Sequence, residues 1–345
     1  MLKFQSRRRA WLAIVLIVLG CAAILLNPES STAPPSQTVA YTDIALYHDL
    51  AEQVRAGAGY YETTMRLQRT HHYPTRPFYT VRHPTLTYLA AAFGWTRLQQ
   101  ALLVLLVIVA GVWLVRLSEA TVTERVATIL AIIAGSAAIS SPLLIATHEL
   151  WAGLLICLAL ALRGGKAWWL GVIAAAAAIA FRELAVCFAV LSLVVSVAER
   201  RRTESLAWLG MIAFAVAAIA IHAVLVLSWT LPGDPVSQGW LGLRGPAAAF
   251  HDLTIISILG TLPTTAAIAL ALLSLLGWTA VPGEQNRIAL LFLAGITVLI
   301  GVFARTQNFY WIQLALPTWL VGLGFAPRAI RDLAVAALAP RASAL

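Results

Sequence analysis

Long apolar runs alternate with short polar turns along most of the chain. A helix needs about 20 mostly apolar residues to cross the hydrocarbon core of a bilayer. Applied along the sequence, this length predicts roughly ten membrane-spanning helices, over residues 10–26, 98–116, 126–142, 146–162, 167–181, 184–198, 206–229, 252–278, 287–304 and 311–326. We therefore expect an all-α polytopic membrane protein in which residues 1–345 form a single transmembrane domain.

One segment, 43–56, breaks this pattern because its apolar residues alternate with polar ones at helical spacing. Thr42 is the predicted N-cap, and Gly57 is positioned to end the helix. An apolar stripe of this kind can lie on the membrane surface. The first outer loop, 27–97, is thus predicted to carry an interfacial helix, followed by irregular chain from Gly59 to Pro84.

Composition agrees with the membrane prediction and narrows the function. Hydrophobic residues make up 60% of the chain and charged residues only 11%, which is far from the balance of a soluble domain. The net charge of +9 comes from basic residues dispersed around apolar runs, with no recognition motif beside them, so we expect no nucleic-acid partner. The three cysteines lie inside apolar runs and form neither a disulfide framework nor a zinc pattern.

The basic residues also predict the orientation. Short loops that carry Lys or Arg face the cytoplasm. With the N-terminus inside, every short cytoplasmic loop agrees with this rule, since this side then receives ten basic residues: Arg116, Arg125, Arg163, Lys166, Arg200, Arg201, Arg202, Arg287, Arg328 and Arg331. The tail, 327–345, is then short, basic and cytoplasmic. In the outer loop, Arg55, Arg66 and Arg69 are expected to be solvated surface charges.

Several ionisable residues fall at the outer ends of predicted spans. An ionisable side chain at membrane depth costs about 2.5–3.5 kcal/mol, so Glu149, beside His148, indicates a functional position. Arg182 and Glu183 form a second such pair. They either pair with opposite charges in the bundle, or Arg182 contacts an anion such as a phosphate. His222, inside an apolar run, is expected to be satisfied by a neighbouring span.

Five segments, in order along the chain, resemble the GT-C superfamily of membrane glycosyltransferases, in particular its protein mannosyltransferase and aminoarabinose transferase branch. The segments are D-x5-D-L-A followed by GAGYY, RHPTLTYLAAAFGWTRLQ, THELWAGLLICLALALRGGKAWWLG, FRELAV and RTQNFYWIQLALPTWLVGLG. In many relatives an Asp-Glu pair stands at the first of these, whereas here Asp43 is followed by Ile44.

The resemblance implies transfer of a sugar from a polyprenyl-phosphate donor to a hydroxyl of a lipid, glycan or protein, at the outer face of a bacterial cytoplasmic membrane. It implies Asp43 as the catalytic base, whereas spacing alone equally fits an acidic first turn. Arg182, Arg305 and Arg82 are the candidates for the donor phosphate. The candidate pocket comprises His148, Glu149, Glu183, Tyr60, Tyr61, His83, Gln307, Asn308 and Tyr310; an interfacial belt is the alternative for the aromatic ones.

Some relatives use a divalent cation, and Asp43, His148 and Glu149 are its candidate ligands, although their spacing is not diagnostic. Two other functions stay open. A flippase of lipid-linked precursors would show inverted repeats and charges near the midplane, whereas the ionisable residues here gather near the outer surface. A non-catalytic subunit of the same fold would bind the donor without transferring the sugar.

Overall fold

The computed structural model describes residues 42–339 and scattered positions between Trp11 and Ile24. Helices account for 78% of it, and the described residues contain no strand, so the predicted all-α class is confirmed. The first predicted span, 10–26, lies outside the described residues apart from those positions. So do the start of the outer loop, 27–41, and the end of the tail, 340–345.

Three helices among the described residues are long and apolar enough to cross a membrane. They are α5 (Trp95–Arg116), α10 (Arg202–Ser228) and α13 (Gln285–Phe303). A fourth span results if η6 (Thr306–Leu314) and the chain over Leu316–Leu338 are counted together across a bend of 59°. Other apolar helices have 10–17 residues, so a membrane protein is supported but ten spans are not confirmed.

The predicted span 252–278 is not one helix. It is divided into α11 (Ala247–Ile256), the short η5 (Ile258–Thr261) and α12 (Thr264–Trp278). The Ser257 side chain accepts from the Leu259 backbone N–H and begins a new turn. Pro263 has no N–H to continue the ladder, so the helix restarts after it.

The helix predicted over 43–56 is present as α2 (Asp43–Arg55), and its interfacial position stays a prediction. The Thr42 hydroxyl accepts from the Ala45 backbone N–H at 3.2 Å, which confirms the predicted N-cap. Gly57 follows with φ of +98°, a conformation that favours glycine. The buried side of α2 consists of Leu46, Leu50 and Ala51, so its stripe packs on protein.

The chain from Gly59 to Pro84, predicted to be irregular, instead contains α3 (Tyr60–Thr70) and the short η1 (Phe78–Thr80), and α4 (Thr85–Phe93) follows it. The prediction was wrong because α3 buries polar residues, Thr63, Thr64 and Gln68, beside its apolar ones. The segment is amphipathic at helical spacing, but it is polar on average and contains no long apolar run.

Contacts divide the chain into two compact units. The first unit comprises 1–32, 110–137 and 241–345, with α6 (Val122–Gly135), α11 to α13, α14 (Leu316–Val321) and α15 (Ala326–Leu338). Two indole N–H groups tie its helices together: Trp278 donates to Thr318 O and Trp319 to Ala271 O, each at 3.0 Å. Because α15 covers the start of the predicted tail, 327–345, that segment is partly helical. The single transmembrane domain stays a prediction.

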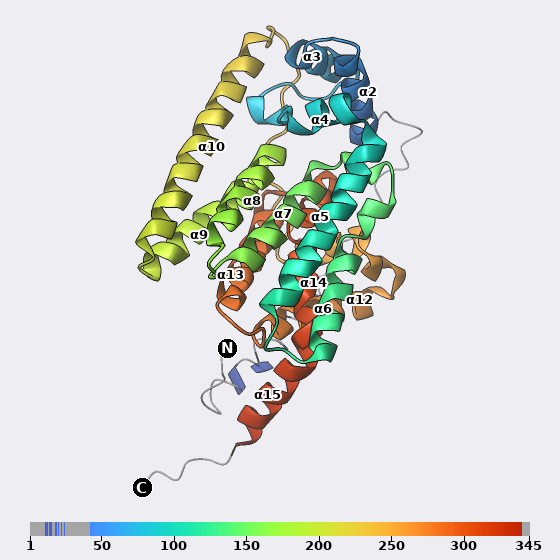
Figure 1. The fold of residues 1–345 in the computed structure, drawn as a ribbon. Helices are drawn as coiled ribbons and strands as arrows, with labels where there is room; N and C mark the ends of the chain where they lie inside the picture. Colours follow the sequence, from blue (N-terminus) through green and yellow to red (C-terminus); the bar gives the residue numbers. More distant parts are fainter. Residues whose placement is uncertain are drawn as a thin grey trace. The chain divides into compact units, whose positions relative to one another are not determined.

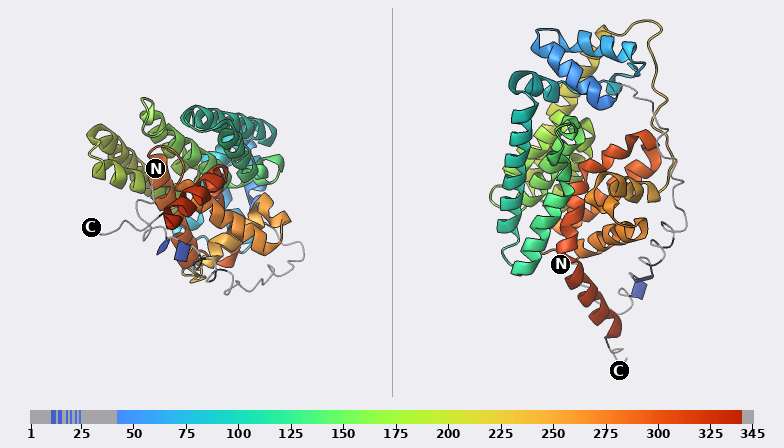
Figure 2. Two further views of the ribbon diagram at one scale, coloured as in Figure 1. Left: turned by 90° about the horizontal axis from the view of Figure 1, so that it is seen from below. Right: turned by 90° about the vertical axis from the view of Figure 1, so that its right-hand side faces the viewer.

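The second unit comprises 33–109 and 138–240, with α2 to α4 and four consecutive helices, α7 (His148–Leu162), α8 (Trp168–Phe181), α9 (Val186–Ala198) and α10. Short turns join these four, which lie side by side as an antiparallel set (Figure 1). Figure 2 (left) shows the green members of the set close to end-on.

One end of this set is held by a charge network. Buried Arg163 contacts Glu199 at 2.9 Å and Glu204 at 3.0 Å, and Arg201 contacts the same two carboxylates. The predicted orientation places this end at the cytoplasmic side.

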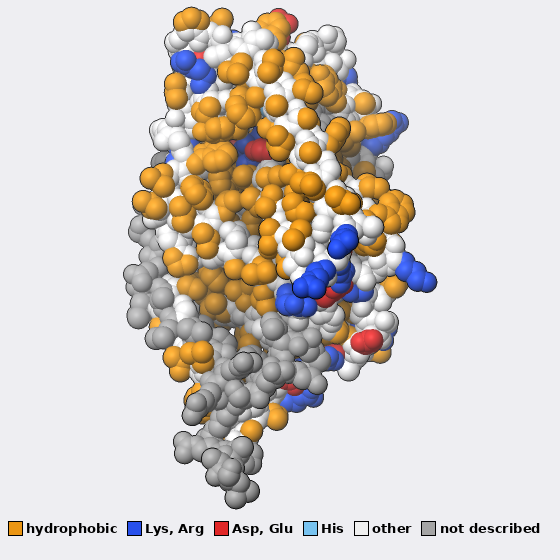
Figure 3. All heavy atoms as spheres, turned by 90° about the vertical axis from the view of Figure 1, so that its left-hand side faces the viewer, with side chains coloured by type: hydrophobic (Ala, Val, Ile, Leu, Met, Phe, Trp, Pro, Cys, Tyr) orange, Lys and Arg blue, Asp and Glu red, His pale blue; other side chains and the backbone are white. Residues whose placement is uncertain are grey.

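Between its ends, α10 exposes large apolar side chains, among them Leu206, Phe214 and Ile221. Hydrophobic side chains also predominate on the face shown in Figure 3. A surface of this kind fits contact with lipid, because exposed apolar patches of this extent are rare on soluble monomers.

Beyond the other end of α10, the chain is bound to α3 by a bidentate ion pair. Arg69 donates to the two Asp234 oxygens at 2.6 and 2.9 Å and to Trp229 O at 2.6 Å. Arg76 also donates to Asp234 O, at 2.8 Å. Arg55 likewise donates to the carbonyls of Ala90 and Ala91. The prediction that Arg55 and Arg69 are merely solvated was therefore wrong.

We expect Asp234→Asn to lower stability and to remove a pH dependence. The hydrogen bonds from Arg69 lower the pKa of Asp234 from 3.8 to about 2. The pair therefore stabilises fully above about pH 4 and is lost as the pH falls through 2. The cost of the substitution is about 1–2 kcal/mol, because Arg69 is partly exposed. Thermal unfolding in detergent measures it, and Glu62→Gln on the exposed side of α3 is the control. Equal melting temperatures for both variants at pH 7 would contradict the assignment.

Candidate functional site

The site begins at a break between α8 and α9. Arg182 has extended backbone angles, φ −146° and ψ 113°, so the helix stops there and restarts through η4 (Glu183–Ala185). The break leaves Arg182 and Glu183 between two apolar helices, at the end of the set opposite to Arg163. Two ionisable groups are thereby placed side by side where α7 begins.

Arg182 is neutralised by two carboxylates. Its Nε lies 2.5 Å from Glu149 Oε1, and its Nη1 pairs with Glu183. The side chains of Arg182 and Glu149 are 1% and 3% exposed, so both charges are almost fully desolvated. Of the two predictions for Arg182, pairing within the bundle is the one that the structure shows. An isolated buried guanidinium would cost far more than a paired one.

A second guanidinium approaches one of these carboxylates, that of Glu183. Arg82, between η1 and α4, has its Nη1 4.0 Å from Glu183 Oε1 and its Nε 3.3 Å from the Tyr47 hydroxyl. Its side chain is 17% exposed, so it is the more accessible of the two arginines. Tyr60 is buried and donates to the Arg82 carbonyl at 2.5 Å, and therefore fixes this stretch of backbone.

The charges set the protonation of Glu183. Burial opposes its ionisation, but Arg182 and Arg82 outweigh that effect and lower the pKa of Glu183 to about 2. The carboxylate is therefore ionised at neutral pH and is a weak base. The cluster as a whole holds two cations and two anions.

His148 lies against this cluster at the start of α7 and is 1% exposed. Its ring packs edge-on against Tyr47, with centroids 4.8 Å apart. Neither of its nitrogens makes a hydrogen bond to any residue that the structure describes. A buried imidazole without partners is costly, so this position is built for something other than packing.

Asp43 is the first residue of α2, half-buried, and makes no hydrogen bond or ion pair within the described residues. Residues four apart share one face of a helix, so Asp43 lies one turn before Tyr47. Since Tyr47 contacts both Arg82 and His148, the face of α2 that begins with Asp43 borders the charged cluster.

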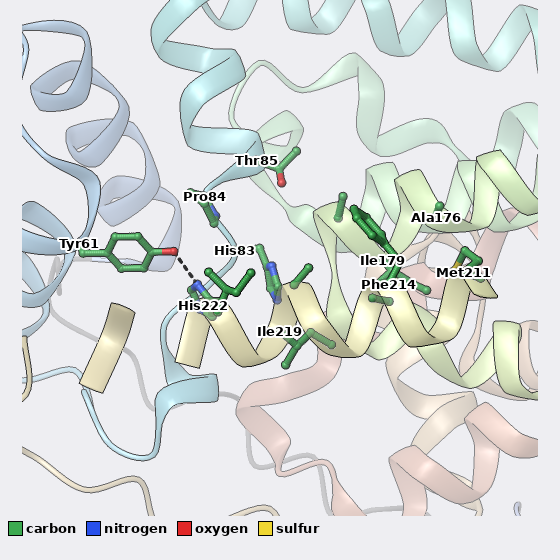
Figure 4. A pocket seen from close by; sticks show the side chains of 14 residues that line it. Tyr61, His83, Pro84, Thr85, Ala176, Ile179, Met211, Phe214, Ile219 and His222 are labelled. Carbon is green, nitrogen blue, oxygen red and sulfur yellow. Dashed lines mark hydrogen bonds between the residues drawn. The ribbon is translucent and has the colours of Figure 1, made fainter. Parts of the chain in front are cut away.

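An apolar groove of about 260 Å³ lies between α8 and α10. Its polar end is made by Tyr61, His83, Thr85 and His222 (Figure 4). The rings of His83 and His222 are stacked, with centroids 4.5 Å apart. The groove lies beside the charged cluster, because His83 directly follows Arg82.

His222 holds one tautomer. Its Nε2 lies 3.1 Å from the Val81 carbonyl, which can only accept, so Nε2 carries the proton. Its Nδ1 then accepts from the Tyr61 hydroxyl at 3.1 Å. His222 is thus satisfied by Val81 and Tyr61. The prediction that a neighbouring span would satisfy it was wrong.

The remaining predicted site residues belong to the first unit. Arg305 precedes η6, and its backbone N–H donates to Asn308 Oδ1 at 3.2 Å. The Thr306 hydroxyl lies 3.5 Å from Gln307 Oε1, and Tyr310 packs edge-on against Phe309. Their part in the site stays a prediction.

No group of three or more His, Cys, Asp and Glu side chains in the described part of the chain is arranged to hold a metal ion. The structure therefore lends no support to a metal held by Asp43, His148 and Glu149. Glu149 instead uses Oε1 to contact Arg182.

Sequence reasoning missed three groups at this site. Tyr47 belongs to the apolar stripe predicted over 43–56 and was not singled out, although its position four residues after Asp43 could have revealed it. Thr85 and His222 line the groove, and the signal for His222 was a lone histidine in an apolar run. Comparison with protein-family models, with curated proteins and with solved structures found no match to this chain.

The Glu149–Arg182 pair generates a stability prediction. Glu149→Leu leaves Arg182 buried with one carboxylate fewer, and we expect a loss of about 3–5 kcal/mol. The double variant Glu149→Leu, Arg182→Met removes both buried charges, so its melting temperature is expected to recover most of that loss. Thermal unfolding in detergent gives both values. A double variant as unstable as the sum of the two single variants would contradict direct pairing.

Proposed function

We propose that the protein is a membrane glycosyltransferase that transfers a sugar from a polyprenyl-phosphate donor to a hydroxyl acceptor at the outer face of the bacterial cytoplasmic membrane. The observation that carries the proposal is the cluster of Arg82, Arg182, Glu149 and Glu183, bordered by α2 and adjoining a groove open to lipid. The charged groups fit the anionic head of the donor, and the groove beside them fits the hydrocarbon chain of a lipid substrate.

In this function Arg82 contacts the donor phosphate. It is the more exposed guanidinium, and its planar fork matches phosphate oxygens. Arg182 acts differently, because Glu149 and Glu183 already hold it in place. It positions Glu183, which in turn lies within 4.0 Å of Arg82.

Asp43 is the proposed catalytic base. Glu183 is a poor alternative because its low pKa makes it a weak base. Asp43 has no partner among the described residues and opens the face of α2 that borders the cluster. The base takes the proton of the acceptor hydroxyl as its oxygen bonds to the anomeric carbon.

In the same step the bond between the anomeric carbon and the phosphate oxygen breaks. The electron pair of that bond leaves with the polyprenyl phosphate, whose charge increases. Arg82 stabilises this growing charge in an environment of low dielectric constant. No oxidant or further reactant is needed, and the proton that leaves the acceptor resides on Asp43.

We expect Asp43→Asn to reduce transfer by about 10²–10⁴-fold, because the amide cannot accept the proton. The assay uses membranes of a strain that lacks the gene and in which the wild type restores a glycan or glycolipid, read by mass spectrometry. Glu52→Gln, on the exposed side of the same helix, is the matched control. Full transfer by a correctly inserted Asp43→Asn protein would remove Asp43 from the mechanism.

Arg82→Ala is expected to weaken the binding of polyprenyl phosphate by about tenfold or more, since a charge-assisted hydrogen bond contributes about 1.5–3 kcal/mol. Tryptophan fluorescence of the purified protein, titrated with polyprenyl phosphate in detergent, measures the change. Arg97→Ala controls for the loss of an exposed arginine in the same unit. Equal affinities for the two variants would exclude Arg82 as the phosphate contact.

A further inference from the structure

The α8–α10 groove has features that a donor phosphate does not explain. Its walls come from small and apolar residues, such as Ala176 and Ala180 of α8 and Met211 and Ala218 of α10. If a methylene group occupies roughly the 30 Å³ of a water molecule, about 260 Å³ holds roughly nine of them. This volume accommodates part of one hydrocarbon chain.

The groove is open along its side. Phe214 and Ile221 line it and are 75% and 62% exposed. Both belong to α10, the helix that exposes apolar side chains along its length. A chain can therefore enter from the hydrocarbon of the bilayer without passing through water.

The polar end of the groove is uncharged. None of the lining residues is Lys, Arg, Asp or Glu. Burial, reinforced by the neighbouring His222, lowers the pKa of His83, so this imidazole is neutral at neutral pH. Bringing an anionic phosphate here would cost desolvation without a compensating cation.

Two groups at this end are open to a ligand. The side chains of His83 and Thr85 make no hydrogen bond within the described residues, whereas His222 is occupied by Tyr61 and Val81. A neutral imidazole offers one donor and one acceptor, and a hydroxyl offers both. Together they match a hydroxyl or ester group of an uncharged lipid.

Resting on the proposed function, we infer that the acceptor is a membrane lipid with an uncharged, hydroxyl-bearing head, of the diacylglycerol class. Its chain lies in the α8–α10 groove and its hydroxyl at His83 and Thr85. Because His83 directly follows Arg82, that hydroxyl is next to the proposed phosphate contact. The two head groups therefore differ in charge and occupy different positions. The anionic donor phosphate lies at Arg82, and the neutral acceptor hydroxyl lies at His83.

The test uses the full-length protein in phosphatidylcholine vesicles that contain a photoreactive diacylglycerol. Labelled peptides are expected from α8 and α10, over Ala176–Ala180 and Met211–His222. Ala218→Phe fills the groove from an exposed position and is expected to reduce labelling at least tenfold. Ala217→Phe adds the same ring to the neighbouring exposed position outside the groove and is expected to label like the wild type.

Head-group recognition is tested separately. Thr85→Val removes one hydroxyl at nearly constant volume and is expected to weaken labelling several-fold. Unlabelled diacylglycerol is expected to compete with the probe, whereas phosphatidic acid with the same chains is not. Equal competition by phosphatidic acid, or undiminished labelling of Ala218→Phe, would overturn the inference.

The labelling experiment can fail while the proposed function stands, because labelling and sugar transfer are measured separately. Asp43→Asn is expected to keep full labelling while it loses transfer. Absent labelling with intact transfer to a glycan or protein would sink the lipid acceptor and leave the glycosyltransferase standing.

Discussion

The second unit depends on the burial of one cation between two anions. Arg182 is 1% exposed and is possible at such depth only because Glu149 and Glu183 compensate its charge. The two carboxylates come from different helices, one from the first turn of α7 and one from η4. Breaking the chain between α8 and α9 is what allows Arg182 and Glu183 to turn toward α7. Packing and charge at this end of α7 to α10 therefore depend on the same three side chains.

The charged side chains of α7 to α10 and their turns lie at the two ends of this set of helices, and few lie between the ends. Arg163, Glu199, Arg201 and Glu204 form the network at one end, and the Arg182 cluster forms the other. The apolar length between them suits hydrocarbon. The two networks differ in their surroundings, because the Arg182 cluster lies beside the α8–α10 groove and beside a helix whose first carboxylate is unpaired among the described residues.

The sequence predicted features that depend on local chemistry. The Thr42 cap, the turn at Gly57 and the apolar helices near 146–162, 167–181 and 184–198 agree with the structure to within a few residues. The failures came where tertiary contacts decide. Helix α3 buries threonines and a glutamine, so its buried face is not marked by a run of apolar residues. The interruption of 252–278 needed the local cap at Ser257 and the restart after Pro263 to be recognised. Pairing partners such as Glu149 for Arg182 or Tyr61 for His222 lie 33 and more residues away, and no spacing rule reaches them.

Because the α8–α10 groove is open along its side, the ligand concentration that determines how often the groove is filled is the concentration within the bilayer. A ligand that arrives through the side of a helix pair diffuses in two dimensions, and its relevant concentration is its mole fraction among neighbouring lipids. A lipid that is rare in the cell as a whole can be abundant on that scale beside Phe214 and Ile221, the exposed residues that line the opening. Changes in bilayer composition would then regulate the protein directly, with no change in the protein itself.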